Sequence, residues 1–187
     1  MDFLNYEFLG NSITDYLYFS ASFLIGLLLI IPIRLFISKL LFKLFGKDND
    51  QNDNEKFNSL LKKPLQYFLT LLVLYFSVQF VSLPEFLSST EEGGLNLVEY
   101  FDKGYNLLLL ITIFWTIIRS VDFIGFKLKN KALKTESKVD DQLIPFAIDI
   151  AKVLTIVLAL VMILGNVFDF NVTALVTGLG IGGVAFA

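Results

Sequence analysis

The fold is decided by the stretch VTALVTGLGIGGVAFA, residues 172–187, which carries no charge and has four glycines within six residues. In a soluble helix, each interior glycine costs about 1 kcal/mol relative to alanine. The pattern therefore needs a compensating gain from packing or motion. In a lipid bilayer, small residues supply that gain because they let helix backbones approach closely. We predict a tightly packed membrane helix here.

The same stretch contains a literal G-x-G-x-x-G pattern, formed by Gly178, Gly180 and Gly183. In a dinucleotide-binding fold, this loop links a strand to a helix, and an acidic residue about 20 positions later binds the ribose. Here the preceding segment, residues 146–168, is of membrane-crossing length, and only a three-residue polar turn separates the two. This context rejects a nucleotide site.

Five segments of the chain approach the roughly 20 apolar residues that a helix needs to cross the hydrocarbon core. They are residues 16–37, 65–83, 104–126, 146–168 and 172–187. Hydrophobic residues make up 55% of the 187-residue chain, and residues 68–76 show almost none of the polar stripe of a soluble amphipathic helix. We predict an all-α membrane protein with about five transmembrane helices. The polar run at residues 47–56 is interpreted as a solvated loop.

The positive charges predict the orientation of these helices. Residues 38–63 and residues 119–145 hold six Lys and Arg each, whereas residues 1–15, 84–103 and 169–171 together hold one. Since Lys and Arg are retained on the cytoplasmic side, we expect the N-terminus outside and the last helix directed inward. Residues 1–15 lack the cationic region of a cleavable signal peptide, so we expect the first helix to be retained.

The composition lacks two residue types that most enzyme sites use. The chain has no Cys and no His, and these are common nucleophiles, general bases and metal ligands. A net charge of -3 does not favour nucleic-acid binding. We therefore expect no catalytic residue, no metal, no cofactor and no nucleic-acid partner.

Several charged residues fall inside or at the ends of predicted membrane helices. They are Arg34, Arg119, Asp122, Asp149 and Lys152. Charge at membrane depth is functional by default, yet these positions lie near helix ends from which long side chains reach the interface. We interpret them as anchors and local ion pairs, with Asp149 and Lys152 as a pair three residues apart. Proton relay or voltage sensing is the alternative.

Four lysines recur at helical spacing after the third predicted helix. They are Lys127, Lys131, Lys134 and Lys138. This spacing predicts an interfacial helix whose cations face anionic lipid headgroups. Ordinary anchoring on the cytoplasmic side explains the same residues.

A resemblance decides how the glycine-rich helix is used. The motif VDDQLIP at residues 139–145, the following helix and residues 172–187 together resemble the small-conductance mechanosensitive channel (MscS-like) family over about 50 residues. In that family, three helices form the membrane core, and the last lines a heptameric pore. The resemblance implies a channel core at residues 104–187, whose pore helix is cut at its gate, and an additional membrane region of two helices at residues 1–103.

The family pattern also implies roles for single residues. Val184 falls on the first hydrophobic constriction, although the family usually has Leu there. Phe186 is bulky at a position that faces away from the pore, and Ala187 stands where Gly is usual. The positions expected to pack pore helices together are Ala174, Gly178, Gly180, Gly182, Gly183, Ala185 and Ala187.

The function implied by this resemblance is an ion channel opened by membrane tension. Ions and small osmolytes would leave the cell through it on hypo-osmotic shock. The implied assembly is a homo-heptamer surrounded by membrane lipids, multi-pass in the bacterial inner membrane. Two alternatives stay open: a non-conducting membrane scaffold or assembly subunit, and an ion-coupled transporter that uses the charged residues inside the helices.

Overall fold

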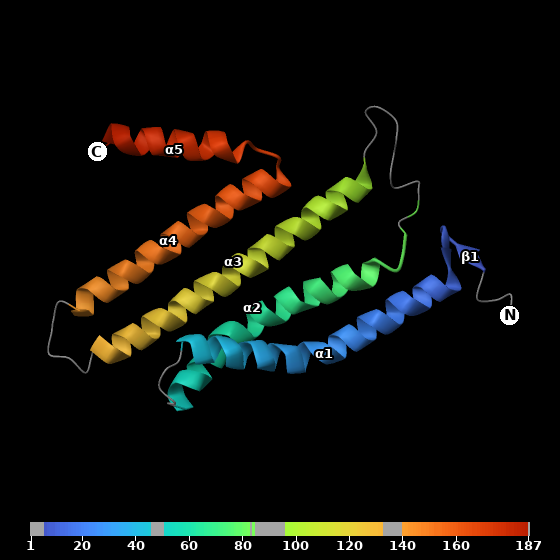
Figure 1. The fold of residues 1–187 in the computed structure, drawn as a ribbon, viewed down its shortest axis with the longest axis horizontal. Coiled ribbons are helices and arrows are strands. Elements are labelled where there is room, and N and C mark those ends of the chain that lie inside the picture. Colours follow the sequence, from blue (N-terminus) through green and yellow to red (C-terminus); the bar gives the residue numbers. More distant parts are fainter. Residues whose placement is uncertain (1–5, 46–50, 83, 85–95, 133–139, 187) are drawn as a thin grey trace. The chain divides into compact units, whose positions relative to one another are not determined.

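The structure, a computed structural model, describes residues 6–45, 51–82, 84, 96–132 and 140–186. A short antiparallel hairpin, β1 (Glu7–Phe8) and β2 (Asn11–Ser12), precedes five helices. The helices are α1 (Ile13–Phe45), α2 (Gln51–Val78), α3 (Leu97–Ala132), α4 (Asp140–Val167) and α5 (Val172–Phe186) (Figure 1). The chain divides into two compact units, Met1–Tyr105 and Asn106–Ala187. The fold is all-α apart from the hairpin, as predicted.

Three of the described helices are long and apolar enough to cross a membrane: Ile13–Lys43 of α1, all of α3 and Leu143–Val167 of α4. A shorter apolar helix covers Val172–Gly183. In α1 and α4, few residues of the apolar window are buried within the chain. Exposed apolar surface on this scale needs lipid or other helices to cover it. The protein is therefore a membrane protein.

Helix α2 differs from the prediction at both ends. It begins at Gln51, so the expected loop at residues 47–56 is wrong for residues 51–56; residues 47–50 lie outside the described part. It ends at Val78, and its apolar part from Leu65 gives about 21 Å of helix, less than the roughly 30 Å hydrocarbon core. The number of crossings stays a prediction that depends on α2 and α5.

The first half of α2 is helical because one of its faces is buried. Phe57, Leu61, Leu65 and Leu69 recur every four residues and are all buried, so they form one apolar stripe. Phe57 packs edge to face on Phe42 of α1. Most of the other residues of this segment are polar. Packing on α1 therefore folds a stretch whose composition is typical of a loop.

Side-chain hydrogen bonds stabilise the N-terminal end of α1. Ser12 and Asp15 cap α1 reciprocally: the Asp15 carboxylate accepts from the Ser12 backbone N–H at 2.8 Å, and the Ser12 hydroxyl accepts from the Asp15 N–H at 3.3 Å. The Asn11 amide donates to the Ser82 carbonyl and accepts from the Ser82 N–H, both at 2.7 Å. The hairpin thereby ties the start of α1 to the segment after α2.

Gly26 marks a close approach of α1 and α2, since a Cβ atom there would collide with the side chain of Val73. We expect Gly26→Leu to destabilise the protein by about 1–3 kcal/mol, the usual range for overpacking. Gly104→Leu is the matched control because no atom lies within 4 Å of its Cβ position, so helix propensity should make it neutral or stabilising. Unfolding in mixed micelles, followed by circular dichroism, measures both. Equal losses would contradict a tight contact at Gly26.

In the second unit, α3 and α4 run side by side in opposite directions (Figure 1). Phe123 and Gly125 of α3 are buried, and the Ile148 side chain of α4 occupies the space that a Cβ at Gly125 would need. The absence of a side chain at Gly125 therefore lets α4 approach α3 closely.

Candidate pore helix and supporting charge cluster

A tight turn positions α5 after α4. Helix α4 ends at Val167, and Asp169 adopts φ 57°, a left-handed conformation in which Asp and Asn are the commonest residues after Gly. The Phe170 N–H donates to the Leu164 carbonyl at 3.0 Å, which satisfies one of the free carbonyls at the helix end. The Asn171 side chain caps α5 by accepting from the Ala174 N–H at 3.1 Å. The polar turn thus reverses the chain within a few residues.

Contact between α4 and α5 is close at this turn. The Val172 side chain lies where a Cβ atom at Gly165 would be. Farther along α5, a Cβ at Gly178, Gly180, Gly182 or Gly183 would meet no atom of the described chain within 4 Å. The four glycines therefore do not pack against α4 in this structure.

The residues predicted to form the pore helix lie, where described, on α5, which the other described residues leave largely uncovered. Those with a described environment are exposed, except for Gly182, which is half-buried: Ala174, Gly178, Gly180, Gly182, Gly183 and Ala185. The bulkier Val176 and Ile181 are 55% and 68% exposed. Val184 belongs to α5, but its side chain lies outside the described residues, as does Ala187. The roles of these residues stay predictions.

A cluster of three charges joins α3 to α4. One oxygen of the Asp122 carboxylate binds Arg119 at 3.0 Å, and the other binds Lys152 of α4 at 2.5 Å. Only 18% of the Asp122 side chain is exposed, so both contacts form in a partly desolvated site, where ion pairs are stronger than at the surface. The Arg119–Asp122 pair is local, as expected. The Lys152–Asp122 pair connects two helices.

The predicted pair of Asp149 and Lys152 is wrong. Asp149 is exposed and forms no ion pair within the described residues, because the lysine amine turns toward α3. A signal for the true partner was present in the sequence. Residues 122 and 152 are nearly equally far from the middle of the segment between α3 and α4, and such positions lie at similar depth in an antiparallel helix pair.

The basic stretch after the third predicted membrane segment is not a separate interfacial helix as far as Ala132. Lys127 and Lys131 lie on α3, which continues without a break to that residue. Lys131 is exposed and Lys127 is half-buried. Lys134 and Lys138 lie outside the described residues. A role for these lysines at lipid headgroups stays a prediction.

Removing the acid at the centre of the charge cluster should leave two cations without a partner. We expect Asp122→Asn to destabilise the protein by about 1–3 kcal/mol, between the values for exposed and buried pairs. Asp149→Asn is the control, because Asp149 lies on α4 and forms no ion pair among the described residues. It should change stability by less than about 0.5 kcal/mol. Adding Lys152→Gln to Asp122→Asn should restore part of the loss. A strictly additive double variant would contradict coupling between α3 and α4 through this pair.

The chain was also compared with known proteins. No family model matches it, and no solved structure matches it significantly. The small-conductance mechanosensitive channel MscMJ of Methanocaldococcus jannaschii is 26% identical, over 98% of this chain and 49% of the relative. The large-conductance mechanosensitive channel MscMJLR of the same organism is 28% identical, over 88% of this chain and 44% of the relative. The chain spans about half the length of these curated relatives.

These matches extend well beyond the motif at residues 139–187. A match over 98% of the chain includes α1 and α2, which the resemblance over about 50 residues leaves aside. The sequence similarity to a channel of this type therefore includes the region of α1 and α2. The relatives confirm the resemblance: the chain is similar to a small-conductance and a large-conductance mechanosensitive channel, which supports an MscS-like family.

Proposed function

We propose that the chain forms the membrane part of a mechanosensitive ion channel, with α5 of each subunit lining a central pore. The observation that carries this proposal is the uncharged, glycine-rich α5, where a Cβ added at Gly178, Gly180, Gly182 or Gly183 would meet no atom of the described residues within 4 Å. Small faces of this kind let identical helices pack around a symmetry axis. Both relatives are named as mechanosensitive channels and not as enzymes.

The proposed closed state is a pore blocked by hydrophobic side chains, with Val184 at the constriction. A narrow apolar ring excludes water and so stops ions without a physical plug. Bilayer tension favours a state with greater in-plane area, and the population shifts toward it in proportion to that difference. The glycines of α5 then allow neighbouring pore helices to slide and separate until the constriction becomes wet.

The tension reaches α5 through the helices that contact lipid. Apolar side chains of α4 such as Val153, Leu154 and Leu158 are 58–59% exposed and are available to acyl chains. In this proposal, the Asp122 cluster makes α3 and α4 move together, and the short turn at Asp169 passes their displacement to α5. The core of the channel is residues 104–187, and residues 1–103 form an additional membrane region.

The remaining features of the proposal follow from the resemblance and the charge pattern. We propose a homo-heptamer with its N-terminus outside, five membrane crossings and poor ion selectivity, which releases ions and small osmolytes on hypo-osmotic shock. Its location is the cytoplasmic membrane of the cell. A bacterial inner membrane is a narrower expectation, and both relatives are archaeal.

Patch recording tests the proposed function. The complete reading frame that contains this chain is expressed in cells without their own mechanosensitive channels, and suction is raised stepwise to the lytic limit. We expect pressure-evoked single-channel currents and improved survival of a downshift in osmolarity. Well-expressed, membrane-inserted protein with no evoked current at any tolerated tension would refute the channel and favour the non-conducting scaffold.

A further inference from the structure

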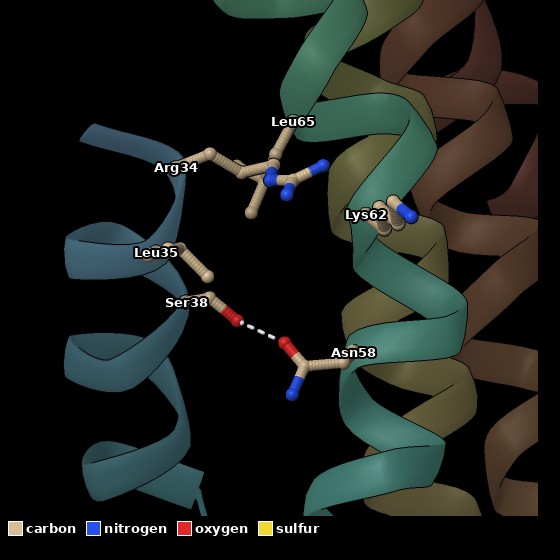
Figure 2. Close-up of a pocket in the computed structure, with 6 residues that line it drawn as sticks. All are labelled: Arg34, Leu35, Ser38, Asn58, Lys62 and Leu65. Carbon is tan, nitrogen blue, oxygen red and sulfur yellow. Dashed lines mark hydrogen bonds between the residues drawn. The ribbon is translucent and has the colours of Figure 1, made fainter. Parts of the chain in front are cut away.

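A pocket of about 170 Å³ lies between α1 and α2 (Figure 2). Its six lining residues come from both helices of the first unit: Arg34, Leu35, Ser38, Asn58, Lys62 and Leu65. The pocket is far smaller than the several hundred Å³ of a typical drug-sized site. Its size fits a single compact polar group.

The pocket has a closed floor and an accessible rim. Ser38 and Leu65 are buried, with 7% and 4% exposure, whereas Asn58 and Lys62 are exposed and Arg34 is half-buried. The Ser38 hydroxyl donates to the Asn58 side-chain oxygen at 2.9 Å (Figure 2). This bond holds the polar side of the pocket in place and joins the two helices there.

The charged residues that line the pocket are all positive. Arg34 and Lys62 contribute two cations, and none of the six lining residues is acidic. Arg34 makes one long contact, an Nη1–H donated to the Gln66 side-chain oxygen at 3.5 Å, which leaves most of the five guanidinium donors available. Within the described part of the chain, neither cation forms an ion pair. A two-cation pocket of this size is suited to a phosphate group.

We propose that this pocket binds the phosphate of an anionic phospholipid headgroup. The source is a lipid because exposed apolar side chains lie on the pocket side of α1: Leu35, which lines the pocket, is 46% exposed, and Ile31, three residues before Arg34, is 59% exposed. These side chains offer a surface for acyl chains beside the cationic pocket. Three of the lining residues belong to the Lys-rich range 38–63, which we expect on the cytoplasmic side. Basic pockets between membrane helices on that side can hold such headgroups.

The proposed lipid would bridge α1 and α2 at their connected ends. The Arg34 guanidinium of α1 and the Lys62 ammonium of α2 would share one phosphate. Binding would therefore stabilise the packing of α1 on α2. This site does not depend on the proposed channel activity, because it involves only α1 and α2.

Lipid binding to the purified chain tests the proposal. Native mass spectrometry from detergent measures retention of phosphatidylglycerol, with phosphatidylcholine as the zwitterionic reference and inorganic phosphate as a competitor. The variants are Arg34→Gln, Lys62→Gln and their combination. Lys63→Gln is the matched control, since this neighbouring exposed lysine loses the same charge and does not line the pocket. Circular dichroism checks that each variant keeps its helix content.

We expect about fivefold weaker phosphatidylglycerol binding for each pocket cation removed, with little change for Lys63→Gln. Lys62→Arg should retain binding. An effect of Lys63→Gln equal to that of Lys62→Gln would overturn the site in favour of general surface attraction. Equal retention of phosphatidylcholine would overturn the requirement for an anionic headgroup. Displacement of the lipid by millimolar inorganic phosphate would assign the pocket to a free anion.

Discussion

Replacing Val184 by Asp is expected to open the resting channel. A ring of carboxylates at the constriction is hydrated, so the apolar barrier that excludes water from the closed pore is lost. A shift of about 2.8 kcal/mol toward conducting states would raise their resting population about 100-fold. Currents at zero applied pressure and slower growth of expressing cells measure this effect.

Val184→Leu serves as the control at the same position, because Leu is the residue that the family usually has there. This variant should be silent at rest and need equal or higher tension to open. Normal growth and silent patches from well-expressed Val184→Asp protein would place the constriction at another residue of α5.

Larger side chains at Gly178 and Gly182 of α5 are expected to have the second large effect, a loss of assembly or current. The double variant Gly178→Leu, Gly182→Leu should lose at least about tenfold of its assembled form or of its tension-evoked current, since Leu side chains prevent close backbone approach. Within the described residues, a Cβ at either position would meet no atom within 4 Å. Helix propensity alone would favour Leu over Gly by about 1 kcal/mol per site. A loss of assembly would therefore report contact between subunits.

Val176→Leu is the matched control for this experiment. It enlarges a residue of the same helix that is already bulky and exposed, so assembly and current should change little. Chemical cross-linking in native membranes counts the subunits, and pressure steps in excised patches measure the current. If the glycine variant assembles and conducts like the starting protein, α5 does not pack against its copies through Gly178 and Gly182.

Local patterns were enough to predict the long apolar helices, though not their ends. The segment predicted at residues 104–126 is the central part of a helix that runs from Leu97 to Ala132. Hydropathy marks where a segment meets lipid, whereas backbone hydrogen bonding continues into flanking polar turns. The motif at residues 139–145 and the glycines of α5 also carried the resemblance that the relatives confirm.

Hydropathy and short motifs did not predict which distant segments contact each other. Packing of α2 on α1 made residues 51–56 helical, and it brought Arg34 and Lys62 to one pocket. The partner of Lys152 was likewise decided by the antiparallel register of α3 and α4, which placed Asp122 within reach.

The sequence by itself determined that this chain is an all-α membrane protein related to mechanosensitive channels, because composition, hydropathy and short motifs are properties of neighbouring residues. Only the tertiary structure decided which charges pair, where α2 begins and ends, and that the other described residues leave most of α5 uncovered. The physical reason is that ion pairs and packing depend on distances between helices, and these distances arise only once the helices are packed together.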